Sequence, residues 1–300
     1  MTESSKQPSP PKAASESLVD AIEAPPPVEL SAREEREVRD RMRPRAAVLH
    51  ETIRIEGEHE LHRSPSSLAW SGLAAGSSMG FSLVAMGVLR NSLPDAPWRP
   101  LVVNLGYCIG FLIVIVGRQQ LFTENSLTPV LPLLHNRDRA TAVRVLRLWG
   151  VVLFTNLIGA FLFALVCAKT AVFSPEVRAA FGAIGAEALE GGILSHFLRA
   201  IFSGWLIALL VWLLPSAETS RIFIIVVITY LIGVAGLSHI IAGSVESMYA
   251  VLAGQGTWSS YAIDFFLPVL FGNVIGGSAL VGALAHAQVV AERDLHRSKS

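Results

Sequence analysis

The sequence predicts an all-α membrane protein whose six transmembrane helices form two inverted three-helix repeats. The first observation behind this prediction is composition: of the 300 residues, 52% are apolar and only 16% are charged, with a mean hydropathy of +0.50. Soluble globular proteins carry about 25% charge. The composition therefore excludes an ordinary cytosolic enzyme, a disordered regulator and a nucleic-acid-binding protein. The second observation is a pair of similar motifs separated by 117 residues.

Both ends of the chain predict segments outside the membrane. Residues 1–30 are rich in Pro, Ser and Ala, which predicts a disordered cytoplasmic tail. Residues 292–300 predict a basic cytoplasmic tail. No long apolar run precedes residue 67, so we expect no cleaved signal peptide.

The pattern of charged and apolar residues in 31–63 predicts two charged or amphipathic cytoplasmic helices. The first begins with Ser31 and Glu34 at the spacing of a capping box, and Pro44 interrupts it. From Ala46 onward, apolar residues recur near helical spacing, which predicts a helix lying against another surface rather than crossing the bilayer.

Residues 64–291 predict the transmembrane domain. A helix rises about 1.5 Å per residue and the bilayer core is about 30 Å thick, so each crossing needs roughly 20 uncharged residues. Six apolar stretches meet or approach this length: 68–89, 101–117, 148–168, 200–214, 222–245 and 265–290. The first, third and sixth predict ordinary spanning helices.

The second and fifth of these helices are predicted to be broken. Arg118 and the polar residues after it lead to Pro129, which argues against one straight helix. In the fifth stretch, Gly236 and Gly243 lie on either side of His239. Backbone leaves the helical form at membrane depth only where protein or a water-filled path covers it, so these two places predict the functional centre.

The distribution of basic residues predicts that both termini are cytoplasmic. An even number of crossings puts both termini on one side, together with the arginine-rich segments before residue 64, at 137–147 and at 293–299. Basic residues concentrate on the cytoplasmic side of membrane proteins. The opposite segment 254–264 contains no Lys or Arg.

A motif in the third stretch returns in the sixth. The sequence FTNLIGA surrounds Asn156, and FGNVIGG surrounds Asn273. The same shift of 117 residues places residues 121–123 on residues 238–240. Three helices cannot bring the chain back to its starting side, so two such halves must be inverted, as in many transporters and channels. Asn156 and Asn273 are expected to hydrogen-bond the broken segments.

His239 is the candidate centre of a substrate pathway. An anion that enters a low-dielectric path loses hydration at a cost of many kcal/mol, unless it is neutralised or met by hydrogen-bond donors. An imidazole can do either. Thr123 supplies a hydroxyl group at the other break. The alternative is that His239 only ties two helices together and Thr123 only caps a turn.

Three motifs in order resemble the formate/nitrite transporter family, and within it the YfdC-like branch with a long charged N-terminal extension. LeuPheThr at 121–123 is similar to the family's Ω-loop motif, and His239 with Ala242 to its central histidine segment. PVLFGNVIGG at 268–277 is similar to its last-helix signature. The similarity covers roughly residues 64–290.

The resemblance implies an aquaporin-like fold and a homopentamer in which every protomer has its own pore. It implies a channel or secondary transporter for small monovalent anions such as formate or nitrite, moved with a proton or as the neutral acid, with no enzyme activity and no cofactor. The histidine would lie between two apolar constrictions formed by Tyr107, Phe111, Leu121 and Phe122.

Two positions depart from the family pattern. The family commonly has Asn four residues after the histidine, where this chain has Gly243, and an acidic residue before LeuPheThr, where it has Gln120. Arg199 does not match the position of the family's basic residue near the outer mouth. The anion therefore stays open among formate, nitrite, hydrosulfide and short monocarboxylates.

Other classes of membrane protein fit the sequence less well. Ser203-Gly204 and His286 suggest an intramembrane serine protease, but Ile201 stands where the Gly-x-Ser-Gly motif needs its first glycine. A pore for neutral solutes would share the architecture, yet the paired Asn-Pro-Ala elements are absent. Metal transport needs clustered His, Asp or Cys within the spans, and ATP-driven transport a Gly-rich nucleotide loop; the sequence shows neither.

Overall fold

The computed structural model describes residues 30–41, 45–217, 219–282, 284 and 287–288. The chain divides into two units, residues 1–43 and 44–300. Apart from Leu30, the predicted tails 1–30 and 292–300 lie outside the described residues, as does the interruption predicted at Pro44.

The first unit contains one described helix, α1 (Ala32–Arg41). The backbone N–H of Ser31 donates to Glu34 Oε2 at 2.8 Å, and the N–H of Glu34 donates to Ser31 Oγ at 3.4 Å. These reciprocal bonds confirm the predicted capping box and satisfy two backbone donors that the first helical turn leaves free.

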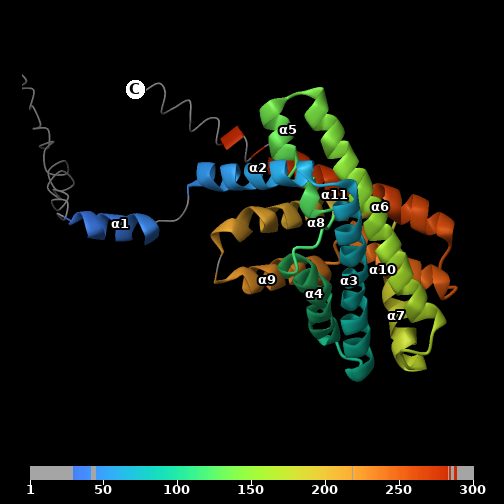
Figure 1. The fold of residues 1–300 in the computed structure, drawn as a ribbon. Coiled ribbons are helices and arrows are strands. Elements are labelled where there is room, and N and C mark those ends of the chain that lie inside the picture. Colours follow the sequence, from blue (N-terminus) through green and yellow to red (C-terminus); the bar gives the residue numbers. More distant parts are fainter. Residues whose placement is uncertain (1–29, 42–44, 218, 283, 285–286, 289–300) are drawn as a thin grey trace, which may run out of the picture. The chain divides into compact units, whose positions relative to one another are not determined.

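The regular secondary structure of the second unit's described residues consists of helices alone (Figure 1). Its elements in chain order are α2 (Ala46–His62), α3 (Pro65–Ser92), α4 (Arg99–Val116), η1 (Glu124–Ser126), α5 (Val130–Asn136), α6 (Arg139–Lys169), α7 (Pro175–Leu189), α8 (Ile193–Leu213), η2 (Leu214–Ser216), α9 (Arg221–Val234), α10 (Ile240–Leu252), η3 (Ser260–Phe266), α11 (Leu267–Val274) and η4 (Ile275–Gly282).

Local sequence sets where several of these helices begin. Ser64 accepts a hydrogen bond from the N–H of Ser67 ahead of Pro65, and Ser174 caps α7 in the same way ahead of Pro175. Asp138 caps α6 by accepting the N–H of Thr141 at 2.9 Å. Hydrogen bonds from Thr141 lower the pKa of the exposed Asp138 carboxyl group, so the cap is present in its charged form at neutral pH.

Five helical segments of the described chain are long and apolar enough to cross a membrane: Pro65–Ser92, Arg99–Val116, Arg139–Lys169, Ile193–Ser216 and Ser260–Ala279. The shorter apolar helices α9 and α10 follow one another in the fifth predicted stretch. The count of six crossings stays a prediction.

Two predicted boundaries were wrong. The fifth stretch was predicted to end at Val245, whereas α10 continues to Leu252, because Glu246 lies inside the helix rather than beyond it. The sixth stretch was predicted to be an ordinary helix from residue 265, whereas π-helical turns η3 and η4 lie on either side of α11. Pro268 lacks an N–H and clashes with the preceding turn, which favours a widened turn at its N-terminal side.

Of the places where the chain leaves helical form, one follows the second predicted stretch and another interrupts the fifth; we call them the first break (residues 117–123) and the second break (residues 235–239). Arg118 adopts a left-handed backbone conformation in the first break, with φ of 50°. Gly236 does so in the second, with φ of 60°, a conformation that glycine adopts without steric cost.

The two halves repeat the same close helix contact. In the first half α3 packs on α6, and a Cβ atom at Gly159 would overlap the carbonyl oxygen of Leu73. In the second half α8 packs on α11 and η4, and a Cβ atom at Gly276 would overlap the carbonyl oxygen of Ile201. Both contacts require glycine because backbone atoms of the neighbouring helix occupy the place of a Cβ atom. The packing of the two halves therefore supports the internal repeat.

Large apolar side chains stand exposed on the outer faces of the helices. Phe154 on α6, Phe202 on α8 and Phe223 on α9 are 66%, 55% and 69% exposed. Many large apolar side chains exposed in this way suit a boundary with lipid or another subunit rather than with water.

Helix α2 packs on α5, α6, α8 and η2. Its buried residues are His50, Ile53, Gly57 and Leu61, whereas Val48 is 54% exposed. A Cβ atom at Gly57 would overlap the carbonyl oxygen of Thr128, so this glycine lets α2 lie directly on the chain before α5. The helix thus covers the end of the domain where the first break returns to helical form.

We predict that Gly159→Ala and Gly276→Ala each lower the free energy of unfolding by about 1–3 kcal/mol, because the added methyl group meets a backbone carbonyl that cannot move alone. Gly150→Ala is the matched control: this exposed helical glycine has open space around it, and alanine favours the helix by about 1 kcal/mol. Thermal unfolding of the detergent-solubilised protein measures all three. Equal unfolding temperatures for Gly276→Ala and Gly150→Ala would contradict the prediction.

Candidate functional site

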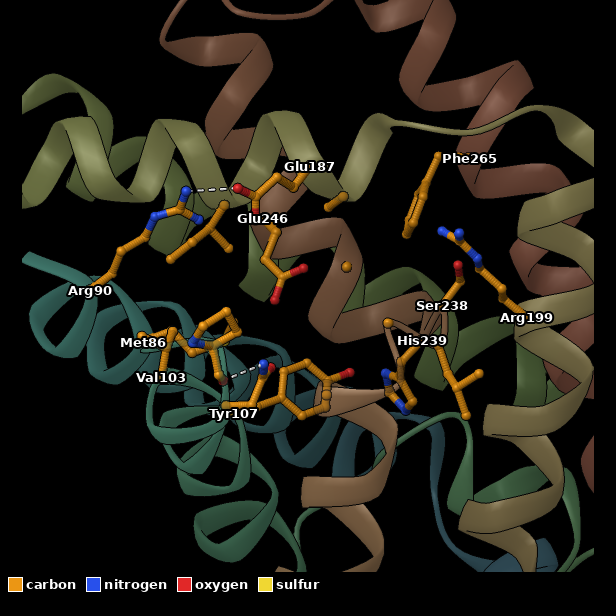
Figure 2. A pocket seen from close by; sticks show the side chains of 18 of the residues that line it. Met86, Arg90, Val103, Tyr107, Glu187, Arg199, Ser238, His239, Glu246 and Phe265 are labelled. Carbon is orange, nitrogen blue, oxygen red and sulfur yellow. Dashed lines mark hydrogen bonds and ion pairs between the residues drawn. The ribbon is translucent and has the colours of Figure 1, made fainter. Parts of the chain in front are cut away.

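A cavity of about 280 Å³ lies among α3, α4, α7, α8 and α10 (Figure 2). His239, Gly243 and Glu246 line it from α10 and its N-cap. These positions are spaced by four and three residues, so they share one face of the helix. The cavity therefore runs along α10 and reaches the second break at His239.

His239 is the N-cap of α10 and is 1% exposed. Its Nδ1 accepts hydrogen bonds from the backbone N–H groups of Ile241 at 3.3 Å and Ala242 at 3.2 Å. Its Nε2 lies 2.8 Å from Thr123 Oγ1. Because Nδ1 accepts, the neutral ring carries its proton on Nε2 and donates it to the threonine hydroxyl. This contact joins the first and second breaks.

Aromatic rings from α4 lie beside this histidine. The rings of Phe111 and His239 meet edge to face with centroids 4.9 Å apart, and the ring of Tyr107 lies 5.3 Å from that of Phe111. Tyr107 also lines the cavity. Leu121 and Phe122 are buried outside the cavity lining, with the Phe122 ring 6.2 Å from the Trp149 ring. The structure thus brings Tyr107, Phe111 and Thr123 to His239.

Asn156 holds the first break in place. It is fully buried on α6, and its Oδ1 accepts the N–H of Phe122 at 2.9 Å. Its Nδ2 donates to the carbonyl oxygens of Gly72 at 2.7 Å and Gln120 at 2.9 Å. One side chain therefore satisfies three backbone groups on α3 and the first break, as buried polar groups require.

Asn273 does the same at the second break. Its Oδ1 accepts the N–H of Ile240 at 2.9 Å. Its Nδ2 donates to Ala200 carbonyl oxygen at 2.8 Å and to Ser238 carbonyl oxygen at 3.2 Å. The equivalence of Asn156 and Asn273 inferred from the repeated motif is therefore visible as the same bonding pattern: one N–H at the break, the carbonyl group two residues before that N–H, and one carbonyl group on the neighbouring long helix.

Ser203 is part of this scaffold. Its hydroxyl donates to the carbonyl oxygens of Ala200 and Ser238 and lies 2.8 Å from Asn273 Nδ2, which donates to it. Its hydrogen-bond partners among the described residues include no histidine ring, and His286 lies outside those residues. The hydroxyl group is thus oriented as a structural donor rather than as a nucleophile activated by a base.

The two departures from the family pattern have structural substitutes. At Gly243, an added Cβ atom would overlap the Phe265 ring, so this ring occupies the space that a side chain at 243 would need. The side chain of Gln120 accepts a hydrogen bond from Asn125 Nδ2 at 2.9 Å, which ties the first break internally. Gly236, with open space around it, serves the second break through its backbone conformation alone.

Charged side chains surround the cavity. Arg90 Nη2 pairs with Glu187 Oε1 at 2.7 Å, and Arg99 Nη2 with Asp95 Oδ1 at 3.0 Å. Arg199 does not match the position of the family's basic residue, but it also lines the cavity. It has no ion pair within the part of the chain that the structure describes. The cavity therefore offers an unpaired cation to an incoming anion.

Two further cavity residues were missed from the sequence, Glu246 and His196. The signal for Glu246 was available: it is an acidic residue in an apolar stretch, seven residues after His239. His196 carried no such signal, and its Nδ1 lies 3.3 Å from Ser238 Oγ. Among the described residues, no group of three or more His, Cys, Asp and Glu side chains could hold a metal ion.

The chain matches known proteins over most of its length. A family model described as formate/nitrite transporter matches residues 47–287. The chain is 43% identical over 250 residues to the inner membrane protein YfdC of Escherichia coli, covering 83% of this chain and 81% of that one. It is 28% identical over 229 residues to the formate channel BtFdhC of Bacillus thuringiensis, covering 68% and 82%.

A solved structure shares the fold. It is described as a pentameric formate channel with formate bound, and it superposes with a TM-score of 0.63 at 20% sequence identity. The match covers 75% of this chain and 98% of that one. At this identity the likeness establishes the fold, which is the aquaporin-like fold that the sequence predicted.

We predict that Asn156→Leu and Asn273→Leu each lower the free energy of unfolding by about 2–4 kcal/mol, because each leaves a buried backbone N–H, that of Phe122 or Ile240, without its partner and removes two hydrogen bonds to carbonyl oxygens. Amide hydrogen exchange at Phe122 and Ile240 should speed up in the respective variants. Thr155→Val is the control, since its hydroxyl bonds only carbonyl oxygens of its own helix. Exchange at Ile240 unchanged in Asn273→Leu would refute the proposed anchor.

Proposed function

The chain belongs to the formate/nitrite transporter family, and from this we propose that it carries small monovalent anions such as formate or nitrite across a bacterial inner membrane, linked to protons through His239. The observation that carries the proposal is the contact between His239 and Thr123, which joins the two breaks at the inner end of the cavity. The homologues are channels and transporters rather than enzymes.

The His239–Thr123 contact supplies the donors that a dehydrated anion needs. The Nε2–H of His239 points at Thr123 Oγ1, and both side chains are buried. An anion that arrives between them would replace this one hydrogen bond by two, one from the imidazole and one from the hydroxyl group. Such an exchange offsets part of the lost hydration and involves no charged residue.

The same geometry limits how His239 takes up a proton. Nδ1 accepts two backbone N–H groups at the positive end of α10, so the ring adds a second proton only by turning away from its cap. We propose that the arriving anion stabilises the turned ring: Nδ1 gains a proton from the aqueous path, and the resulting imidazolium transfers its Nε2 proton to the anion and returns to the neutral form. The anion then passes as the neutral acid.

Apolar rings on both sides of this contact form the barrier to ions and water. Phe111 and Tyr107 lie on the cavity side, and we propose that Leu121 and Phe122 close the path on the other side. Rings of this kind exclude water and so keep charged solutes out unless their charge is cancelled.

The assembly is proposed from the shared fold and the exposed surface. The solved neighbour is a pentamer, and this chain presents exposed Phe154, Phe202 and Phe223 on the outer faces of its helices. We propose a homopentamer with one pore in each protomer and both termini in the cytoplasm. The Arg-rich segment 137–147, at the start of α6, lies on the predicted cytoplasmic side.

We predict that His239→Phe lowers proton-driven formate and nitrite uptake in proteoliposomes to the level of empty liposomes, because no titratable imidazole remains between the breaks. His239→Asn should lose the same activity while its side-chain oxygen still caps α10, which separates chemistry from folding. His59→Phe, on the exposed face of α2, is the matched control. Wild-type uptake rates in His239→Asn would overturn the role of the imidazole.

We predict that Phe122→Ala raises anion leak without a proton gradient several-fold, because it removes a large ring from the proposed inner barrier. Conductance in planar bilayers and the ratio of formate to chloride permeability measure the effect. Phe154→Ala removes the same ring from an exposed outer face and should change neither quantity. Equal conductance in the two variants would count against a barrier at Phe122.

A further inference from the structure

Glu246 is a carboxyl group inside the cavity that the proposed function does not yet use. Its side chain belongs to α10, and the residue is only 8% exposed. Figure 2 shows the carboxyl group directed into the cavity, toward the side where Tyr107 and His239 lie. Neither carboxyl oxygen has a hydrogen-bond or ion-pair partner among the residues that the structure describes.

Glu246 lies on the same face of α10 as His239, farther from the second break. The two residues are separated by seven positions on one helix face, which corresponds to about 10 Å along the axis. Gly243 lies between them on the same face and leaves this stretch of α10 without a side chain. A solute that moves along the face therefore passes the carboxyl group before it reaches the imidazole.

None of the charged groups that face Glu246 across the cavity forms an ion pair with its carboxyl group among the described residues. Glu187 on α7 pairs with Arg90 on α3, and Arg99 pairs with Asp95. The other titratable or charged groups that line the cavity are Tyr107, His196, Arg199 and His239.

The charged and titratable side chains of α6 and η3, which pack on α10 outside the cavity, form no hydrogen bond or ion pair with Glu246 among the described residues. Lys169 of α6 donates to the carbonyl oxygen of Leu252 at 2.8 Å, and Tyr261 of η3 donates to Ser244 Oγ at 3.0 Å. Asp264 of η3 does not line the cavity. No cation in the described chain is therefore bonded to Glu246.

An unpaired carboxylate in such a place conflicts with the passage of an anion. Burying an ionised carboxylate without partners is costly, and a second anion in a cavity of about 280 Å³ adds like-charge repulsion. Both costs disappear when the carboxyl group carries a proton. The acid form also has an O–H group that can donate to an anion.

We propose that Glu246 carries the proton that travels with the anion. In its acid form it meets the anion in the cavity, and the O–H bond of Glu246 breaks as a new O–H bond forms on the anion. The neutral acid moves on to His239 and Thr123, and Glu246 regains a proton from water at the cavity mouth. This inference rests on the proposed function and adds the residue that supplies the proton.

The test compares two driving forces in proteoliposomes that contain the full chain. Labelled formate uptake is measured with a pH gradient at zero membrane potential, and then with a membrane potential and no pH gradient. We expect Glu246→Gln to lower uptake driven by the pH gradient at least tenfold, because an amide cannot transfer the proton. Uptake driven by the potential should stay the same or rise, since the repulsion is gone.

Two further variants make the result specific. Glu246→Asp keeps an acid group and should restore most of the gradient-driven uptake. Glu190→Gln makes the same chemical change at an exposed residue after α7 that does not line the cavity, and should behave as wild type. If Glu246→Gln does not assemble on size-exclusion chromatography, Glu246→Leu replaces it in the same measurements.

Each other outcome overturns the inference in its own way. Gradient-driven uptake in Glu246→Gln equal to that in Glu190→Gln would show that Glu246 supplies no proton. If Glu246→Gln loses formate uptake under both driving forces, and only the wild type takes up methylammonium, then Glu246 binds a cation and is not the proton donor. No uptake of formate or nitrite by the wild type under either driving force would instead refute the proposed function itself.

Discussion

The structure depends on satisfying backbone hydrogen bonds where two helices stop inside the membrane domain. In hydrocarbon no water pairs with free N–H and C=O groups, so each break is stable only if protein groups replace the missing helical bonds. Asn156 and Asn273 provide these bonds, each to an N–H and a carbonyl group at one break and to the long helix beside it. The contact between Thr123 and His239 exists because both breaks are held in this way.

Glycine sets how near the asparagines come to the breaks. Gly159 and Gly276 stand one helical turn after the two asparagines, and each lies against a backbone carbonyl group of the neighbouring helix. Close approach of α6 to α3, and of η4 to α8, places the amide groups within hydrogen-bond distance of the breaks. The motif Asn-x-x-Gly therefore combines the anchor and the spacing that the anchor needs, which explains why both halves contain it.

The sequence predicted what depends on local pattern and missed what depends on packing. Asn156, Asn273, Thr123 and His239 could be found because repeated motifs and interrupted apolar runs are visible in one dimension. The end of α10 could not, because a hydropathy pattern counts Glu246 as the edge of a span and contains nothing of the cavity that admits it. Likewise, the Phe265 ring beside Gly243 comes from a different helix, so its contact appears only in three dimensions.

The N-cap of α10 connects the scaffold to the chemistry. The same Nδ1 atom that accepts two backbone N–H groups is the atom that a second proton would occupy, so holding the ring in place and protonating it exclude one another. A pathway that relied on His239 alone would have to undo its own helix cap in every cycle. A second acid on the same helix face removes that demand, because the anion can gain its proton at Glu246 while His239 keeps the cap and offers only its Nε2–H. The division of tasks along α10 thus follows from the hydrogen bonds of the cap.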